Sequence, residues 1–226
     1  MAYTGQMIAD RAWAKANDKA AVRWTPSDAL MWLNDALRET VVTLPSANSV
    51  TSVVPVAANN ARQTLSGLGL TRAISVADIL RNINADGSPG RSVSLIKREY
   101  LDRHNPEWTQ RMASEARHWM YDARDPDVFY LDAQIIGGGK IEIVCPTLPA
   151  EVASLASPIP IADTYVNALQ AHLLFSFYSN DATYTTASQK AAAYFQLFQQ
   201  ALGIKASSGA QSIEKAKVNS SAGPTA

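Results

Sequence analysis

Few residues of this chain could do acid, base or metal chemistry, and they are widely spaced. The three histidines, His104, His118 and His172, lie far apart, and neither an HxxxH nor an HExxH spacing occurs. That spacing is what places two ligands on one helical face, so its absence gives a metal site little support. The single cysteine, Cys145, ends an apolar run and is expected to be a small core residue. We therefore predict no catalytic residue, no metal site and no cofactor.

Four aspartates, Asp122, Asp125, Asp127 and Asp132, cluster in one segment and leave two interpretations open. They could form a carboxylate pair or a weak cation site, and a small enzyme with an acidic site in the 122–132 segment is kept as the alternative function. More commonly such residues form turns and solvated strand faces. No GxSxG motif occurs, and the Gly137–Gly139 run lacks the Lys-Ser/Thr pair of a phosphate-binding loop.

The composition indicates a globular protein and argues against a DNA reader. Of 226 residues, 47% are hydrophobic and 18% charged, and the formal net charge is zero. A protein that binds nucleic acid through bulk basicity needs an excess of Lys and Arg, so a nonspecific DNA-binding module is disfavoured. We see no basic start followed by an apolar run, and no apolar window of about 18 residues, so we expect no signal peptide and no membrane helix.

Two helices are predicted at the N-terminus. Ile8, Ala12 and Ala16 recur at helical spacing. After Trp24, the residues Thr25, Pro26 and Asp28 fit an N-cap, a first helical position and a capping-box acid. Leu33 and Leu37 then continue an apolar stripe that must stop by Leu44, before Pro45.

The middle of the chain is rich in β-branched residues, and the end is helical again. Residues 117–145 are predicted to form a three-stranded meander, with Asp125-Pro126-Asp127 as its first turn. Residues 159–203 are predicted to form a helical hairpin, and residues 204–226 have the composition of a segment that cannot fold by itself. The predicted parts are N-terminal helices (1–48), a β-rich insertion (49–150), the hairpin (151–203) and an extended tail (204–226).

The fold class that follows is α+β: an antiparallel helical bundle, made of the N-terminal helix pair and the C-terminal hairpin, with an inserted β-rich domain and an extended C-terminal tail. The residues predicted to form the bundle core share an apolar character and helical spacing; they are Leu33, Leu37, Val166, Leu169, Leu173, Phe177, Phe195 and Phe198.

Four stretches of the sequence resemble the head-to-tail adaptor (connector, or neck) proteins of tailed bacteriophages. They are VRWTPSDALMWLNDALRETV, REYLDRHNPEW, DPDVFYLD leading into KIEIVCPTLPAEV, and SPIPIADTYVNALQAHLLFSFYSNDATYTTASQKAAAYFQLFQQALG. Together they span most of residues 20–203. None of these motifs is catalytic, and the resemblance rests on their order and spacing.

The resemblance implies a structural virion protein rather than an enzyme. It implies a homo-oligomeric ring, usually of twelve copies, between the portal protein and a downstream tail or nozzle protein. DNA would pass through the lumen during packaging, retention and ejection without sequence-specific binding, no membrane would be involved, and assembly would take place in the host cytoplasm. The C-terminal tail would dock on the portal through residues that we expect to be Ile204, Lys205, Ile213, Lys215, Lys217 and Val218.

Overall fold

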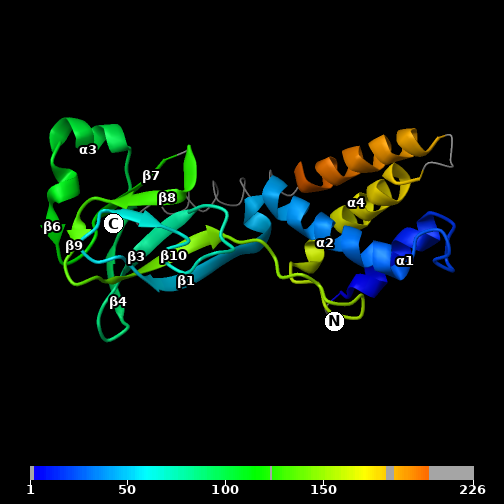
Figure 1. Cartoon of the computed structure of the whole chain (residues 1–226), viewed down its shortest axis with the longest axis horizontal. Helices are drawn as coiled ribbons and strands as arrows, with labels where there is room; N and C mark the ends of the chain where they lie inside the picture. Colours follow the sequence, from blue (N-terminus) through cyan, green and yellow to red (C-terminus); the bar gives the residue numbers. More distant parts are fainter. Residues whose placement is uncertain (1–2, 123, 182–185, 204–226) are drawn as a thin grey trace, which may run out of the picture. The chain divides into compact units, whose positions relative to one another are not determined.

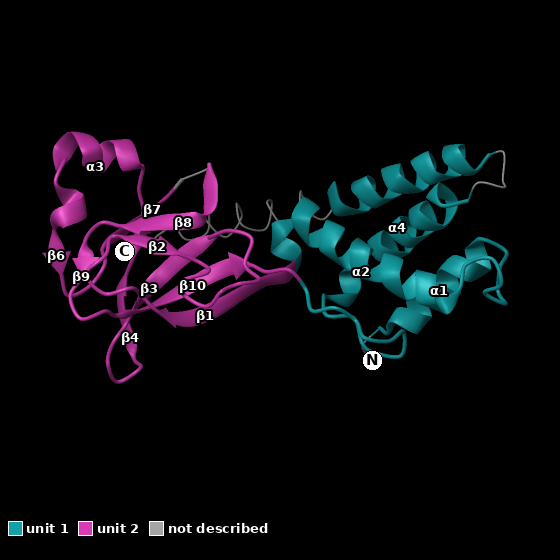
Figure 2. Ribbon diagram, viewed as in Figure 1, with its two compact units in different colours: residues 1–47, 149–226 teal, residues 48–148 magenta. Residues whose placement is uncertain are grey.

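The computed structural model describes residues 3–122, 124–181 and 186–203 (Figure 1). The predicted α+β class is confirmed, because helices and several sheets are both present. The chain divides into two compact units, one of residues 1–47 and 149–226 and the other of residues 48–148 (Figure 2). Each unit is described by itself.

The first unit is built mainly from helices. Its elements are α1 (Gly5–Lys15), α2 (Pro26–Thr43), the 3-10 turn Asp163–Tyr165, α4 (Val166–Ser179) and a helix over residues 187–203. A 3-10 turn at Pro45–Asn48 follows α2. The predicted hairpin therefore has two helical arms, but its first helix begins at Val166 rather than near Ile159, because residues 159–162 are not helical.

Local chemistry fixes the start of α2 as the sequence predicts. The Thr25 hydroxyl accepts a hydrogen bond from the Asp28 backbone N–H (3.3 Å), and the Asp28 carboxylate accepts one from the Thr25 backbone N–H (3.2 Å). Pro26 occupies the first turn, where its missing N–H has no cost. This capping box is confirmed.

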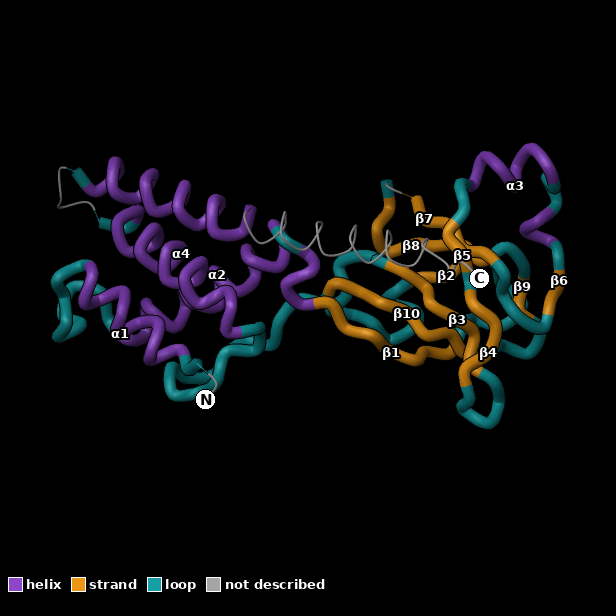
Figure 3. Tube along the Cα trace, turned by 180° about the vertical axis from the view of Figure 1, so that it is seen from behind, coloured by secondary structure: helices purple, strands orange, loops and turns teal. Residues whose placement is uncertain are grey.

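Helix α4 lies between the α1–α2 side of the unit and the helix at residues 187–203 (Figures 1 and 3). On the first side the Trp24 ring stacks on Phe177, with centroids 4.8 Å apart, and its Nε1–H donates to the Phe177 carbonyl oxygen (3.0 Å). On the second side the Phe198 ring contacts His172, with centroids 5.0 Å apart. Because α4 is covered on both sides, it is apolar nearly all round.

The described residues of the second unit form three sheets. Strand orders are β1-β10-β3-β4 and β2-β8-β7-β5 in the two four-stranded sheets, and β6-β9 in the small one. The strands are β1 (Ser49–Pro55), β2 (Arg62–Thr64), β3 (Asp78–Ile83), β4 (Pro89–Ser92), β5 (Ser94–Leu95), β6 (Met112–Ala113), β7 (His118–Asp122), β8 (Asp125–Leu131), β9 (Gln134–Ile135) and β10 (Lys140–Pro146). A short helix α3 (Arg98–His104) and a 3-10 turn (Trp108–Gln110) complete the unit.

The two four-stranded sheets share one apolar core. Ile79 and Ile143 enter it from the first sheet, and Trp119, Phe129 and Leu131 enter it from the second. All five are at most 1% exposed. Residues far apart in the chain therefore meet in one packed interior, which holds the strands of both sheets in place.

The predicted three-stranded meander is wrong in its third strand. β7 and β8 pair antiparallel as expected, but β10 pairs with β1 and β3 in the other sheet. Asp125-Pro126-Asp127 is also not a turn, because β8 already begins at Asp125. The alternation of apolar residues in β10 fits either sheet, and the long-range partner β1 decides between them.

Candidate functional site

Two aspartates of the acidic segment, Asp127 and Asp132, make structural contacts, and the side chain of Asp122 lies outside what the structure describes. The Asp132 carboxylate is 4% exposed; it accepts hydrogen bonds from the backbone N–H groups of Arg117 (2.9 Å) and His118 (3.2 Å), and it is ion-paired with Arg111. Asp127 accepts hydrogen bonds from the Ser66 backbone and hydroxyl. Both carboxylates thus tie segments of the β-rich unit together, while Asp125 is exposed.

No metal-binding group is present in the part of the chain that the structure describes, since no three His, Cys, Asp or Glu side chains lie together there. Cys145 is buried, and burial raises the pKa of its thiol to about 11, so it is not a thiolate nucleophile near neutral pH. His104 lies at the end of α3, His118 in β7 and His172 in α4.

His172 is a buried titratable group of the helical unit. It is 7% exposed, lies against the rings of Phe175 and Phe198, and its Nδ1 atom has no hydrogen-bond partner among the described residues. Burial lowers its pKa, and the carboxylates of Glu39 and Asp35 on α2 oppose that shift. His172 is therefore neutral at physiological pH and acts as part of the helical core.

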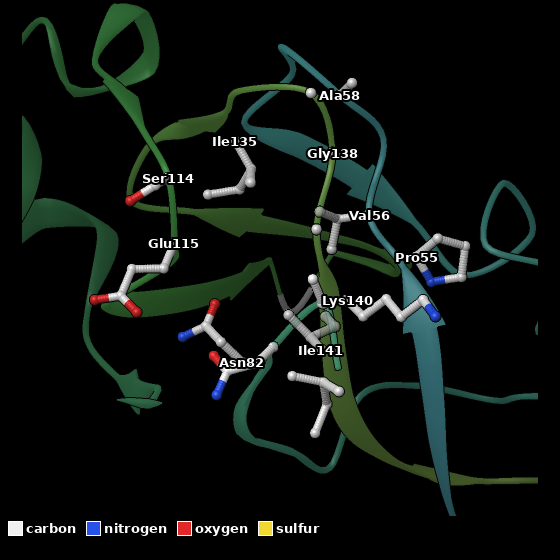
Figure 4. Close-up of a pocket in the computed structure, with 15 residues that line it drawn as sticks. Pro55, Val56, Ala58, Asn82, Ser114, Glu115, Ile135, Gly138, Lys140 and Ile141 are labelled. Carbon is white, nitrogen blue, oxygen red and sulfur yellow. The ribbon is translucent and has the colours of Figure 1, made fainter. Parts of the chain in front are cut away.

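A cavity of about 630 Å³ opens at one end of the first sheet in the β-rich unit (Figure 4). Its polar wall contains Asn82, Ser114, Glu115 and Lys140, and Figure 4 shows Glu115 and Lys140 on opposite sides. Glu115 is ion-paired with Arg91 (3.3 Å), and the Asn82 side chain bonds the backbone of Ala116 in both directions. Two of these polar groups, Glu115 and Asn82, are therefore engaged in structural contacts within the unit.

Comparison of the sequence with models of known protein families assigns the chain to a family. A family model described as SU10 adaptor protein matches residues 3–221, nearly the whole sequence. The chain belongs to the SU10 adaptor protein family. The resemblance to tailed-phage head-to-tail adaptors inferred from the sequence is thereby confirmed. No curated protein matches the chain.

Membership of this adaptor family gives a coarse function. The family consists of structural phage adaptors, so this chain has a structural head–tail adaptor role and is a component of the virion. It is not a known enzyme family. Adaptor membership implies oligomeric assembly with other virion proteins. Within the described residues, no helix is long and apolar enough to cross a bilayer.

The structure describes the residues predicted to form the bundle core, but not the residues predicted to form the tail site. Seven of the eight core residues are buried, at most 4% exposed, and Phe195 is half-buried. They are Leu33, Leu37, Val166, Leu169, Leu173, Phe177 and Phe198. The six tail residues Ile204, Lys205, Ile213, Lys215, Lys217 and Val218 lie outside the described residues.

For an adaptor, the relevant sites are surfaces that another protein can cover. Exposed apolar side chains occur on α1 and α2 (Met7, Met31 and Val42), on the loop between these helices (Val22), and on β1 (Val50 and Val53). Sequence reasoning did not single out any of them, because exposure of an isolated valine or methionine depends on the packing of the whole unit.

Proposed function

We propose that this adaptor-family chain is the subunit of a homo-oligomeric ring of twelve copies that joins the portal protein to a downstream tail or nozzle protein. The observation that carries the proposal is the family match over residues 3–221. The net charge of zero also supports it, because twelve copies can pack side by side without mutual repulsion.

In this proposal the ring is a conduit for DNA. The genome passes through the lumen during packaging, is retained there, and leaves through it at ejection, with no sequence-specific contact and no membrane involved. Balanced Lys plus Arg and Asp plus Glu counts, 20 of each, fit a lumen that does not hold DNA by bulk charge. Assembly takes place in the host cytoplasm.

The two units have different structural roles in the proposed ring subunit. The helices of residues 1–48 and 151–203 form an antiparallel bundle, with α4 at its centre, that supplies the packed frame of the subunit. The extensive burial of α4 supports this, because a helix covered on two sides cannot shift without opening the core. Residues 49–150 form the inserted β-rich domain.

The decisive experiment is sedimentation of the purified chain alone and with purified portal rings. The expected result is a twelve-copy ring, formed either spontaneously or only on the portal. A chain that remains monomeric and does not sediment with the portal overturns the proposal.

The tail of residues 204–226 is proposed to dock on the portal through Ile204, Lys205, Ile213, Lys215, Lys217 and Val218. Its low-complexity composition supports this role, because such a segment gains order only on a partner surface. We predict that a chain truncated after Gly203 keeps the thermal unfolding midpoint of the full chain but binds the portal at least about tenfold more weakly, the effect of losing one binding segment. A chain in which residues 204–226 are replaced by a Gly/Ser linker of equal length controls for length, and unchanged portal binding by both variants contradicts the tail proposal.

The acidic-site enzyme has no comparable support. The carboxylates of Asp127 and Asp132 are engaged in structural hydrogen bonds, and no three His, Cys, Asp or Glu side chains lie together among the described residues.

A further inference from the structure

Strand β1 leaves one edge of the first sheet of the β-rich unit open. It stands at the end of the strand order β1-β10-β3-β4, and Figures 1 and 3 show no further strand beside it. Among the described strands β1 pairs with β10 alone, from Ser49 opposite Pro146 to Pro55 opposite Lys140. The other side of this seven-residue strand is therefore available to a strand that the same copy does not supply.

The hydrogen bonds at the two ends of β1 show which of its residues face β10. Just beyond the strand, the Val56 N–H donates to the Gly139 carbonyl oxygen (2.9 Å). Just before it, the Asn48 carbonyl oxygen accepts from the Thr147 N–H (2.9 Å). Bonded residues alternate along an antiparallel pair, so the even-numbered residues of β1 bond to β10 and the odd-numbered residues face away.

The groups that face the open side are the backbone N–H and C=O of Thr51 and Val53. No residue that the structure describes forms a hydrogen bond with these four groups. β1 contains no charged side chain, and Val50 and Val53 are 43% and 52% exposed. Exposed strand edges are usually blocked by lysine, other charges or proline, and β1 has only Pro55, at its last position.

The other sheet edges of this unit are shorter and already carry hydrogen bonds. In β2 the Arg62 N–H donates to the Asn60 side chain (2.9 Å), and the Thr64 carbonyl oxygen accepts a backbone N–H (3.0 Å). In β4 the Arg91 carbonyl oxygen accepts from the Asn82 side chain (2.9 Å). β5, β6 and β9 have two residues each. β1 is thus the one long open edge among the strands that the structure describes.

We propose that two copies of this chain pair through β1, antiparallel, about a two-fold axis at Ser52. In this register Thr51 of each copy lies opposite Val53 of the other. Both are hydrogen-bonded pairs, so all four outward groups of each copy find a partner. The side chains of Thr51 and Val53 meet as β-branched cross-strand pairs, and the two four-stranded sheets become one sheet across the axis.

A second copy is the occupant that these observations select. A strand edge is recognised by the backbone of another extended chain. The outward groups of β1 are self-complementary in the register with its axis at Ser52, and two uncharged strands do not repel each other. In the described part of a second copy, no other strand edge offers a comparable set of groups, so the matching edge is again β1.

This inference goes beyond the proposed ring. The β1 contact joins the same surface of two copies and closes after two, so it cannot recur around a cyclic ring of twelve. The dimer is therefore the form of the chain before assembly, and its copies separate at β1 when they enter the ring. Pairing in the meantime covers an edge that otherwise recruits strands of other proteins.

The first test removes one outward donor. Thr51→Pro deletes an N–H that faces away from β10, a place where an edge strand tolerates proline. Thr51→Val is the matched control, because it keeps both the N–H and the β-branched shape. In sedimentation of the full chain without portal, the wild type and Thr51→Val are expected to dimerise alike. Thr51→Pro is expected to dimerise at least about tenfold more weakly, since each copy loses one donor. Circular dichroism and the unfolding midpoint verify that each variant folds.

The second test reads the register. Ser52 lies opposite itself across the axis as a non-hydrogen-bonded pair, with a Cα separation of about 4.5 Å that a disulfide can span. Ser52→Cys is therefore expected to oxidise to a covalent dimer. Ser92→Cys, at an exposed position of β4 on the opposite edge of the sheet, is the control and is expected to form none. The natural Cys145 is 3% exposed and does not interfere.

Three results overturn the inference: a wild-type chain that forms no dimer, a Thr51→Pro chain that dimerises as the wild type does, or a Ser52→Cys chain that forms no covalent dimer. Hydrogen exchange that protects β1 only in a complex with another virion protein assigns the edge to that protein and also overturns it. Binding to the portal is measured separately. A wild-type dimer that adds no copies to the portal contradicts the proposed ring and leaves the β1 contact standing.

Discussion

At the scale of single residues, Asp132 stabilises the β-rich unit. Its buried carboxylate accepts the N–H groups of Arg117 and His118 and pairs with Arg111. Removal of the carboxylate leaves these donors without a buried acceptor, and each such loss costs about 1–3 kcal/mol.

We predict that Asp132→Ala lowers the free energy of unfolding by about 3 kcal/mol, because two backbone donors and one guanidinium lose their acceptor. Asp125→Ala, at an exposed position of the same segment, is expected to change it by less than about 0.5 kcal/mol. Urea unfolding followed by tryptophan fluorescence measures both variants. Equal effects at the two positions would show that Asp132 does not carry this structural role.

His172 makes the stability of the helical unit depend on pH. Its pKa in the folded chain lies below the ordinary value of 6.5, chiefly because of burial, so below pH 6.5 the unfolded chain binds the additional proton more readily than the folded chain does. The stabilisation contributed by the neutral imidazole is therefore complete above pH 6.5 and is lost as the pH falls below it, by at most about 1.4 kcal/mol for each pH unit.

The measurement is the free energy of unfolding of the wild type and of His172→Phe at pH 7.5, 6.5 and 5.5. Phenylalanine keeps an aromatic ring between Phe175 and Phe198 but cannot take up a proton. The wild type is expected to lose more stability than His172→Phe between pH 6.5 and 5.5. Parallel pH profiles of the two proteins contradict the assignment.

At the scale of elements, the start of α2 depends on the Thr25–Asp28 capping box. Thr25→Ala removes the acceptor for the Asp28 backbone N–H and is expected to cost about 1 kcal/mol of stability. Ser27→Ala, in the same helical turn and exposed, is the matched control and is expected to be nearly neutral. The thermal unfolding midpoints of the two variants test this prediction. A midpoint of Thr25→Ala equal to that of Ser27→Ala would contradict the capping role of Thr25.

The capping box also illustrates what could be predicted from the sequence. Thr25, Pro26 and Asp28 act within one turn, so the capping box can be recognised from four adjacent residues. The same holds for α3, which ends at His104 before Asn105-Pro106. β1 likewise lies where the β-branched run 49–56 predicts a strand.

The elements that could not be predicted depend on distant partners. β10 was assigned to the wrong sheet because its neighbours, β1 and β3, are separated from it by more than fifty residues of chain. In the loop between α1 and α2, Ala21 adopts a left-handed φ of 51°, which no local sequence pattern indicates. The cavity at the end of the first sheet likewise draws on four separate segments of the chain, residues 55–58, 82–85, 114–115 and 135–141.

At the scale of the whole molecule, the chain has features of a structural component of an assembly. Its family is structural, its net charge is zero, and its acidic segment is engaged in structural contacts. The central claim is that these features serve a ring on the portal, with the helical unit as the frame and the tail as the portal contact.

Native mass spectrometry of the complex between this chain and purified portal rings tests that claim most directly. A closed twelve-copy ring on the portal would give a single complex whose mass exceeds that of the portal ring by twelve chains, with no partly filled rings at saturation. A portal ring that gains no mass at saturating concentrations of the chain, or that binds a variable number of copies without closure, would contradict the proposed ring.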